Sequence, residues 1–183
     1  RSFNRLKEYF DKLDMRLIEQ RGVSVFNTEY GLYGSSSLFN VFELFKQIGL
    51  KGCFVDLGSG DGRVALLASL FTTSVGIEGD AKLHELALEA KKSLQEDIPE
   101  LSKCELVHGD YTTMDLSKYE VIFIYADHDW PDWFQKKLKK ECKATLYSLQ
   151  NIYRPDLLKK GKTFWVEQTP FVSYVLDGVS SSE

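Results

Sequence analysis

The amino-acid sequence predicts an α/β fold, in which strands and helices alternate and ligand-binding turns gather at one edge of a mostly parallel sheet. The stretch 54–63, F-V-D-L-G-S-G-D-G-R, reads as a strand that runs into a tight glycine turn. An apolar helical run, Val64 to Phe71, follows at once. A later segment, Glu120 to Asp127, is almost continuously apolar, which is typical of a central strand covered on both faces.

Size and composition are those of one soluble domain. The chain has 183 residues, 43% of them hydrophobic and 27% charged, which suffices for one sizeable core. We expect a single domain over 1–183, with N-terminal helices and a covering loop over 1–48 and the sheet over 49–178. The net charge of -4 argues against broad nucleic-acid affinity, which depends on neutralising phosphates.

The cysteines and the N-terminus favour a cytoplasmic protein. Cys53, Cys104 and Cys142 are odd in number and widely spaced, a pattern typical of reduced thiols rather than of a metal site. No apolar run approaches the roughly 18 residues of a membrane span. Acidic residues such as Glu8 and Asp11 among the N-terminal basic ones do not fit a signal peptide. Nothing in the sequence indicates an oligomeric state.

The N-terminal segment predicts an amphipathic helix over residues 2–20. Its apolar residues alternate spacings of three and four, which places them on one face: Phe3, Leu6, Phe10, Leu13 and Leu17. This face packs on its own domain or forms a dimer contact. Residues 27–37, N-T-E-Y-G-L-Y-G-S-S-S, predict a loop. A serine at its end caps the next helix, Leu38 to Ile48, and Gly49 ends that helix.

The glycine turn predicts a small-molecule site. Glycines accept positive φ and let a ligand lie against the backbone, while the free N–H groups of the following helix favour an acceptor-rich ligand. The turn departs from the dinucleotide fingerprint, because Arg63 occupies the third glycine position, and it lacks the Gly-Lys-Ser/Thr of a phosphate loop. With Asp56 in the strand, the D-x-G-x-G-x-G spacing instead resembles motif I of class I S-adenosylmethionine-dependent methyltransferases.

This resemblance implies a Rossmann-like three-layer sandwich with a seven-stranded, mostly parallel sheet, an antiparallel last strand and an added N-terminal helix. It implies S-adenosyl-L-methionine as cofactor and assigns the turn to its binding: Asp56, Gly58, Ser59, Gly60 and Gly62. The loop before the first core helix tends to close over the cofactor in this family. Tyr33 there is a candidate ligand of the methionine portion, or it merely packs.

Two more strands supply the rest of the predicted cofactor site. Thr73 to Ile77 is a strand that ends in Glu78, about twenty residues past the turn, where a carboxylate can accept hydrogen bonds from both ribose hydroxyls. Asp80 is placed to cap the following helix, 81–95. After the strand Cys104 to His108, the resemblance assigns Asp110 to the adenine amino group and Tyr111 to the adenine face.

The end of the fourth strand carries the predicted catalytic residues. In the family that the turn resembles, the substrate-facing motif follows this strand, which here offers Tyr125, Asp127, His128 and Asp129. Trp130 and Pro131 belong to the same motif or simply begin the helix up to Glu141.

The remaining segments complete the predicted sheet. We expect a fifth strand over 144–150, a short helix over 155–160, and two closing strands, 163–168 and 171–176, joined by Thr169-Pro170. The lysines over 136–143 and 159–162 precede strands, so they lie away from the ligand edge and form a solvated face.

The sequence thus predicts a methyltransferase that acts on a protein side chain such as lysine. The D-L-G-S-G-D-G-R turn, the G-I-E acid and the compact size resemble small seven-strand lysine methyltransferases. Aspartates and aromatic rings would orient the amine, whereas a hydroxyl acceptor would need His128 as general base. A small-molecule or RNA methyltransferase and a non-catalytic S-adenosylmethionine-binding protein are the alternatives.

Overall fold

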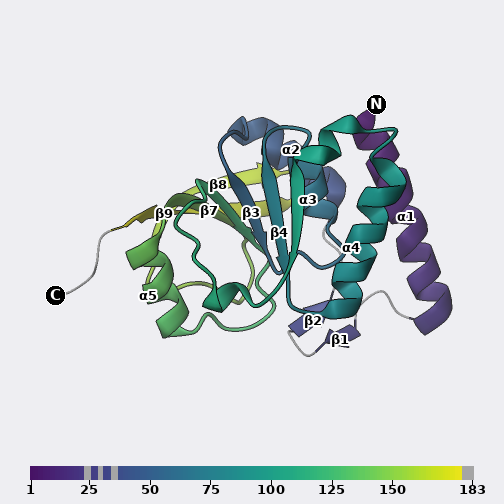
Figure 1. Cartoon of the computed structure of the whole chain (residues 1–183). Helices are drawn as coiled ribbons and strands as arrows, with labels where there is room; N and C mark the ends of the chain where they lie inside the picture. Colours follow the sequence, from purple (N-terminus) through teal and green to yellow (C-terminus); the bar gives the residue numbers. More distant parts are fainter. Residues whose placement is uncertain (23–25, 29–30, 34–36, 179–183) are drawn as a thin grey trace.

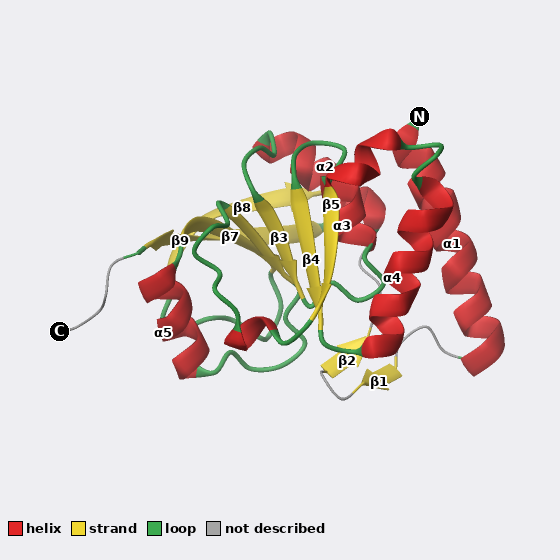
Figure 2. Ribbon diagram, in the orientation of Figure 1, coloured by secondary structure: helices red, strands yellow, loops and turns green. Residues whose placement is uncertain are grey.

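A computed structural model gives the structure of the chain (Figures 1 and 2). It describes residues 1–22, 26–28, 31–33 and 37–178, with the backbone alone for 26–28 and 31–33. Seven strands form one sheet in the order β5-β4-β3-β6-β7-β9-β8. The strands are β3 Phe54–Leu57, β4 Ser74–Glu78, β5 Cys104–His108, β6 Val121–Ile124, β7 Lys143–Leu149, β8 Lys159–Val166 and β9 Thr169–Asp177. The last strand, β9, runs antiparallel to β7 and β8, and the other neighbours pair in parallel, as predicted.

Helices cover both faces of the sheet, which confirms the three-layer prediction (Figure 2). One hydrophobic core lies under four helices: α1 Ser2–Arg21, α2 Leu38–Ile48, α3 Arg63–Ala68 and α4 Ala81–Leu94. A second core on the opposite face lies under α5, Asp132–Glu141, and under connecting segments.

The N-terminal helix packs on its own domain, as the first of the two expectations had it. Leu6, Phe10, Leu13 and Leu17 of α1 are buried, and the helix lies against α2, α3 and α4. The predicted caps also form. The Ser37 hydroxyl accepts a hydrogen bond from the Asn40 amide at 3.3 Å, and Gly49 ends α2 in the left-handed conformation.

Three local predictions are wrong. The segment 27–37 is not simply a loop, because β1, Phe26–Thr28, and β2, Gly31–Tyr33, form an antiparallel pair. Residues 155–160 form no helix, and β8 already begins at Lys159. Within this segment, the Leu157 amide donates a hydrogen bond to Oε1 of the buried Gln135 side chain at 2.7 Å.

The turn between β8 and β9 is the third difference. It lies at Glu167 and Gln168, where Glu167 has a φ of 54°, and not at Thr169-Pro170. Pro170 is the second residue of β9, a strand end where its missing N–H is tolerated.

The three cysteines differ in burial. Cys104 and Cys142 are buried and Cys53 is half-buried, all three as free thiols. Among the described residues, no helix is both long and apolar enough to cross a membrane.

Candidate active site

The glycine turn joins β3 to α3 in the predicted manner. Gly58, Gly60 and Gly62 all have positive φ, between 56° and 82°. The amides of Gly58 and Ser59 both donate to the Ile77 carbonyl at 2.9 Å, which ties the turn to β4. A Cβ at Gly58 would meet nothing nearer than Tyr111 Cε1 at 3.9 Å, so this glycine leaves the turn open toward the tyrosine.

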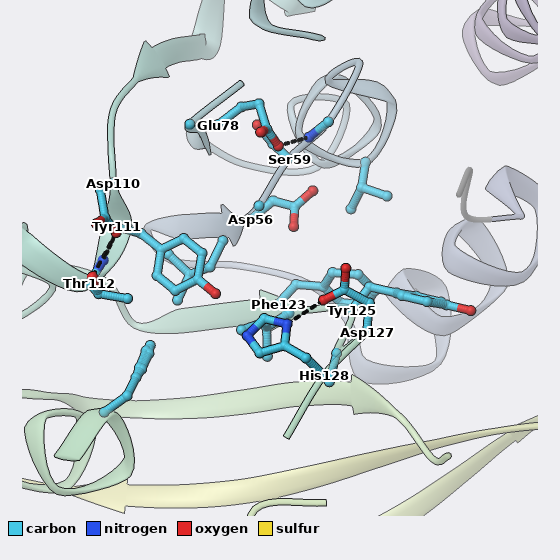
Figure 3. A pocket seen from close by; sticks show the side chains of 18 of the residues that line it. Asp56, Ser59, Glu78, Asp110, Tyr111, Thr112, Phe123, Tyr125, Asp127 and His128 are labelled. Atoms are coloured by element: carbon cyan, nitrogen blue, oxygen red, sulfur yellow. Dashed lines mark hydrogen bonds and ion pairs between the residues drawn. The ribbon is translucent and has the colours of Figure 1, made fainter. Parts of the chain in front are cut away.

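A cavity of about 300 Å³ lies at the carboxyl ends of β3, β4, β5 and β6 (Figure 3). Most of the predicted site residues line it: Asp56, Gly58, Ser59, Gly60, Glu78, Asp110, Tyr111, Tyr125, Asp127, His128 and Asp129. They come from four separate segments, which the parallel sheet brings to one edge.

One predicted cofactor residue, Gly62, is not among the described residues that line the cavity. Gly62 begins α3, and a Cβ there would lie 2.8 Å from the Ala87 Cβ of α4, so this glycine permits close helix packing. The side chain of Tyr33 lies outside the described residues.

Glu78 connects two of the segments. Its Oε1 accepts a hydrogen bond from the Gly60 amide at 2.8 Å, and its Oε2 accepts one from the Asp80 amide at 2.8 Å. Each carboxylate oxygen keeps a second lone pair for a ligand. Asp80 caps α4 as predicted, with its Oδ1 accepting from the Leu83 amide at 2.9 Å.

Asp56 is a buried acid in the middle of the site. Its carboxylate points into the cavity and is 4% exposed as a residue (Figure 3). Burial, followed by the nearby charges of Glu78 and Asp61, raises the pKa of Asp56 well above its ordinary value. A cation in the cavity would therefore stabilise the ionised form of Asp56.

Asp110 and Tyr111 form the wall beyond β5. Asp110 Oδ1 accepts hydrogen bonds from the Thr112 amide at 2.9 Å and from the Thr112 hydroxyl at 2.6 Å. The Tyr111 ring packs 5.4 Å from the Phe134 ring, between centroids, and burial raises the pKa of its phenol to about 12. Tyr111 therefore offers an aromatic face and a protonated hydroxyl at neutral pH.

The segment after β6 contributes an Asp–His pair. His128 Nδ1 lies 2.5 Å from Asp127 Oδ1, and the His128 side chain is 58% exposed (Figure 3). The rings of Tyr125 and Trp133 are also exposed at this wall. Trp130, in contrast, is buried and donates from Nε1 to the Tyr153 carbonyl at 3.2 Å, so it supports the wall.

The sequence analysis missed several lining residues. Thr112, Phe123, Trp133 and Phe134 line the cavity, and no local pattern singles them out. Asp61 and Arg63 also line it. The sequence marks Arg63 only as a departure from the dinucleotide fingerprint, because its partner Asp14 lies 49 residues away in the chain.

The charges at the cavity are predominantly negative. Six carboxylates and one arginine are among its described lining residues: Asp56, Asp61, Glu78, Asp110, Asp127, Asp129 and Arg63. Such a surface favours a cationic ligand and disfavours a polyanion.

Comparison with known proteins identifies the fold. No protein-family model and no curated protein sequence matches the chain. Among solved structures it is similar to an RNA methyltransferase from Salinibacter ruber in complex with S-adenosyl-L-homocysteine, with a TM-score of 0.65 and 21% identity over 81% of this chain and 97% of the other. A SAM-dependent methyltransferase from Aquifex aeolicus gives a TM-score of 0.59 and 17% identity over 74% of this chain and 89% of the other. A variant of MtNAS in complex with S-adenosylmethionine gives a TM-score of 0.60 and 13% identity over 76% of this chain and 63% of the other. These neighbours share the Rossmann-like arrangement that the sequence predicted.

Proposed function

We propose that the chain is an S-adenosyl-L-methionine-dependent methyltransferase whose acceptor is a protein side chain, lysine in the first place. The observation that carries the proposal is the acidic cavity at the glycine turn, in which Glu78 is already held by the Gly60 and Asp80 amides. The fold, which solved methyltransferases share, supports it further.

The residues of the cavity fit this cofactor. The remaining lone pairs of Glu78 suit the two ribose hydroxyls, and Asp110 with Tyr111 suits the adenine. The open backbone at Gly58 suits the methionine portion, because a side chain there would project toward Tyr111. Asp56, whose ionised form is disfavoured by burial, gains from a positively charged ligand. When bound, the cofactor would supply an electrophilic methyl group on a sulfonium.

The wall after β6 fits a cationic acceptor. Asp127 and Asp129 provide negative charge, while Tyr125 and Trp133 provide exposed aromatic faces, on which an alkylammonium group is favoured. The same carboxylates would repel the phosphates of RNA. We therefore place lysine before RNA as the acceptor.

A lysine acceptor must lose its proton before the transfer. With a reference pKa near 10.4, deprotonation costs roughly 4.6 kcal/mol at pH 7. Nearby aspartates raise that pKa, so desolvation and the positive charge of the cofactor must lower it. In this proposal the carboxylates and rings orient the amine, and water takes the proton.

The Asp127–His128 pair favours a second candidate for the methyl acceptor, namely a small molecule with a hydroxyl group. If His128 donates from Nδ1 to Asp127, its Nε2 is left as a proton acceptor. A hydroxyl acceptor would need that base. Substitution of His128 by Ala separates the two acceptors, because it would abolish transfer to a hydroxyl and leave transfer to lysine largely unchanged.

Two measurements test the proposal. Calorimetry should detect binding of both S-adenosylmethionine and S-adenosylhomocysteine, and absence of binding for both contradicts the proposal. The protein should then be incubated with labelled S-adenosylmethionine and cell extract, and protease digestion should release the label that has been transferred. Label released by nuclease would point to RNA, label in the small-molecule fraction to a metabolite, and binding without any transfer to a non-catalytic role.

A further inference from the structure

A buried arginine at the cavity wall is held by two carboxylates. Arg63 is 5% exposed and lines the cavity. Its Nη2 donates to Asp61 Oδ2 at 2.7 Å, and its Nε lies 3.1 Å from Asp61 Oδ1. The second carboxylate comes from helix α1, where Asp14 accepts from Nη2 at 2.6 Å and from Nη1 at 3.1 Å.

Helix α1 contacts this guanidinium with two side chains. Phe10 and Asp14 are one helical turn apart, and the Arg63 guanidinium carbon lies 4.9 Å from the centroid of the Phe10 ring. The Asp14 side chain is 27% exposed, although it stands next to the apolar stripe that anchors the helix. A buried guanidinium requires such pairing, since an uncompensated buried charge is strongly unfavourable.

One carboxylate would already neutralise Arg63. Asp61 and Arg63 together carry no net charge, so with Asp14 these three described residues carry one net negative charge. Asp61 and Arg63 line the cavity that we assign to a cationic sulfonium, and Asp14, which is not among the described lining residues, adds its charge through its contact with Arg63. S-adenosylhomocysteine is a neutral sulfide but otherwise shares the groups of S-adenosylmethionine, so the wall charge can distinguish the two compounds.

We propose that Asp14, through Arg63, is a positioning residue of the cofactor site that keeps the cavity wall negative and thereby favours the cationic cofactor over its neutral product. The inference rests on the proposed function. It extends the site to a helix outside the α/β core, 49 residues away in sequence from Arg63.

The test compares charge variants for both compounds by calorimetry. Asp14→Asn should weaken S-adenosylmethionine binding by about fivefold and S-adenosylhomocysteine binding by less than about twofold. Asp97→Asn is the matched control, because Asp97 also pairs with an arginine at 3.1 Å, but its partner Arg5 is not among the described residues that line the cavity, whereas Arg63 is. It should change neither affinity.

Two further variants test the preference between the two compounds, which is a ratio of two affinities measured on the same folded protein. Arg63→Gln leaves both carboxylates, so it should shift the preference toward S-adenosylmethionine, opposite to Asp14→Asn. The double variant Asp14→Asn with Arg63→Gln has the wild-type net charge, so it should restore the wild-type preference.

Equal weakening of both compounds by Asp14→Asn would overturn the inference, since a loosened turn affects their common groups alike. An unchanged preference in Arg63→Gln would also overturn it. If the wild-type chain binds neither compound, the proposed function itself fails, and this result is distinct from a failure of Asp14 alone.

Discussion

The two acids at the centre of the cavity, Glu78 and Asp56, differ in how strongly the protein stabilises the ionised carboxylate. Glu78 accepts hydrogen bonds from two backbone amides, and such bonds to a charged group are worth roughly 1.5–3 kcal/mol each. Asp56 is buried beside other acids, and the pKa of its carboxyl is raised. Glu78 is therefore prepared for a ligand by its bonds, whereas the ionised form of Asp56 needs a cation.

At Glu78, replacement by Gln should weaken S-adenosylmethionine binding by about tenfold or more, because one oxygen becomes an amide nitrogen that cannot accept a backbone hydrogen bond. Glu120→Gln is the matched control. Its carboxylate also accepts a backbone hydrogen bond, from Cys53 at 2.7 Å, but Glu120 directly precedes β6 at the opposite edge of the sheet. Calorimetry on both variants checks this, and an equal loss of affinity would contradict the role of Glu78.

Asp56→Asn should stabilise the protein and weaken cofactor binding. The folded-state pKa of Asp56 lies above its unfolded value, so the folded state binds the proton more tightly. Wild-type stability therefore falls, relative to the variant, as the pH rises from about 4 through the raised folded-state pKa. Urea denaturation should show that the difference in unfolding free energy is larger in favour of the variant at pH 8 than at pH 4.

Asp115→Asn is the control for the pH series. Hydrogen bonds from Ser117 lower the pKa of that exposed carboxyl. For Asp115→Asn, the difference in unfolding free energy between variant and wild type should therefore shift in favour of the wild type as the pH rises. If Asp56→Asn shows no such trend with pH, the Asp56 carboxyl is not destabilised by burial.

At the scale of elements, the turn between β3 and α3 uses its glycines for two different purposes. Gly58 has a φ of 79° and leaves the backbone open toward Tyr111, while Gly62 has a φ of 82° and lets α3 approach α4 at Ala87. A single sequence motif therefore serves both ligand access and helix packing.

Alanine at each of these positions should separate the two purposes. Both substitutions carry the strain of a left-handed backbone, about 1 kcal/mol, but Gly62→Ala adds a contact of 2.8 Å to the Ala87 Cβ and should cost a further 1–3 kcal/mol, roughly. Thermal unfolding should rank Gly62→Ala as the less stable variant. Calorimetry should rank Gly58→Ala as the weaker binder of S-adenosylmethionine, and the reverse order in either experiment contradicts this division.

Across the whole molecule, the acidic cavity and a group of three lysines lie at opposite ends of the parallel strands. The acidic cavity lies at the carboxyl ends of the parallel strands, whereas Lys143, Lys159 and Lys160 lie at the first residues of β7 and β8. A basic protein segment is therefore attracted to the edge at which the methyl group would be transferred.

Methylation of a lysine peptide with basic flanks should accordingly depend on salt. Raising the ionic strength from 50 to 300 mM should increase KM for that peptide by about threefold or more, because exposed charges are screened beyond a Debye length of roughly 10 Å at 0.1 M. A peptide of equal length with neutral flanks is the control and should respond less. Equal salt dependence of the two peptides would argue against an electrostatic acceptor surface.

The sequence by itself determined those features that depend on residues close together in the chain. The glycine turn, the Ser37 and Asp80 caps and the order of strand-ending acids follow from short patterns, and the structure has the turn and both caps where they were predicted. The register of a parallel sheet then places Glu78, Asp110 and Asp127 at one edge without further information.

The tertiary structure alone decided the features that depend on distant partners. The segment 155–160 forms no helix, and its Leu157 amide donates instead to the distant Gln135 side chain. Gly62 is a packing residue because Ala87 lies beside it. In the sequence, Arg63 is only a departure from a glycine motif. The structure shows that Asp14 and Phe10 of α1 contact its guanidinium. A buried charge requires a partner, but chain folding and not sequence pattern determines which residue provides it.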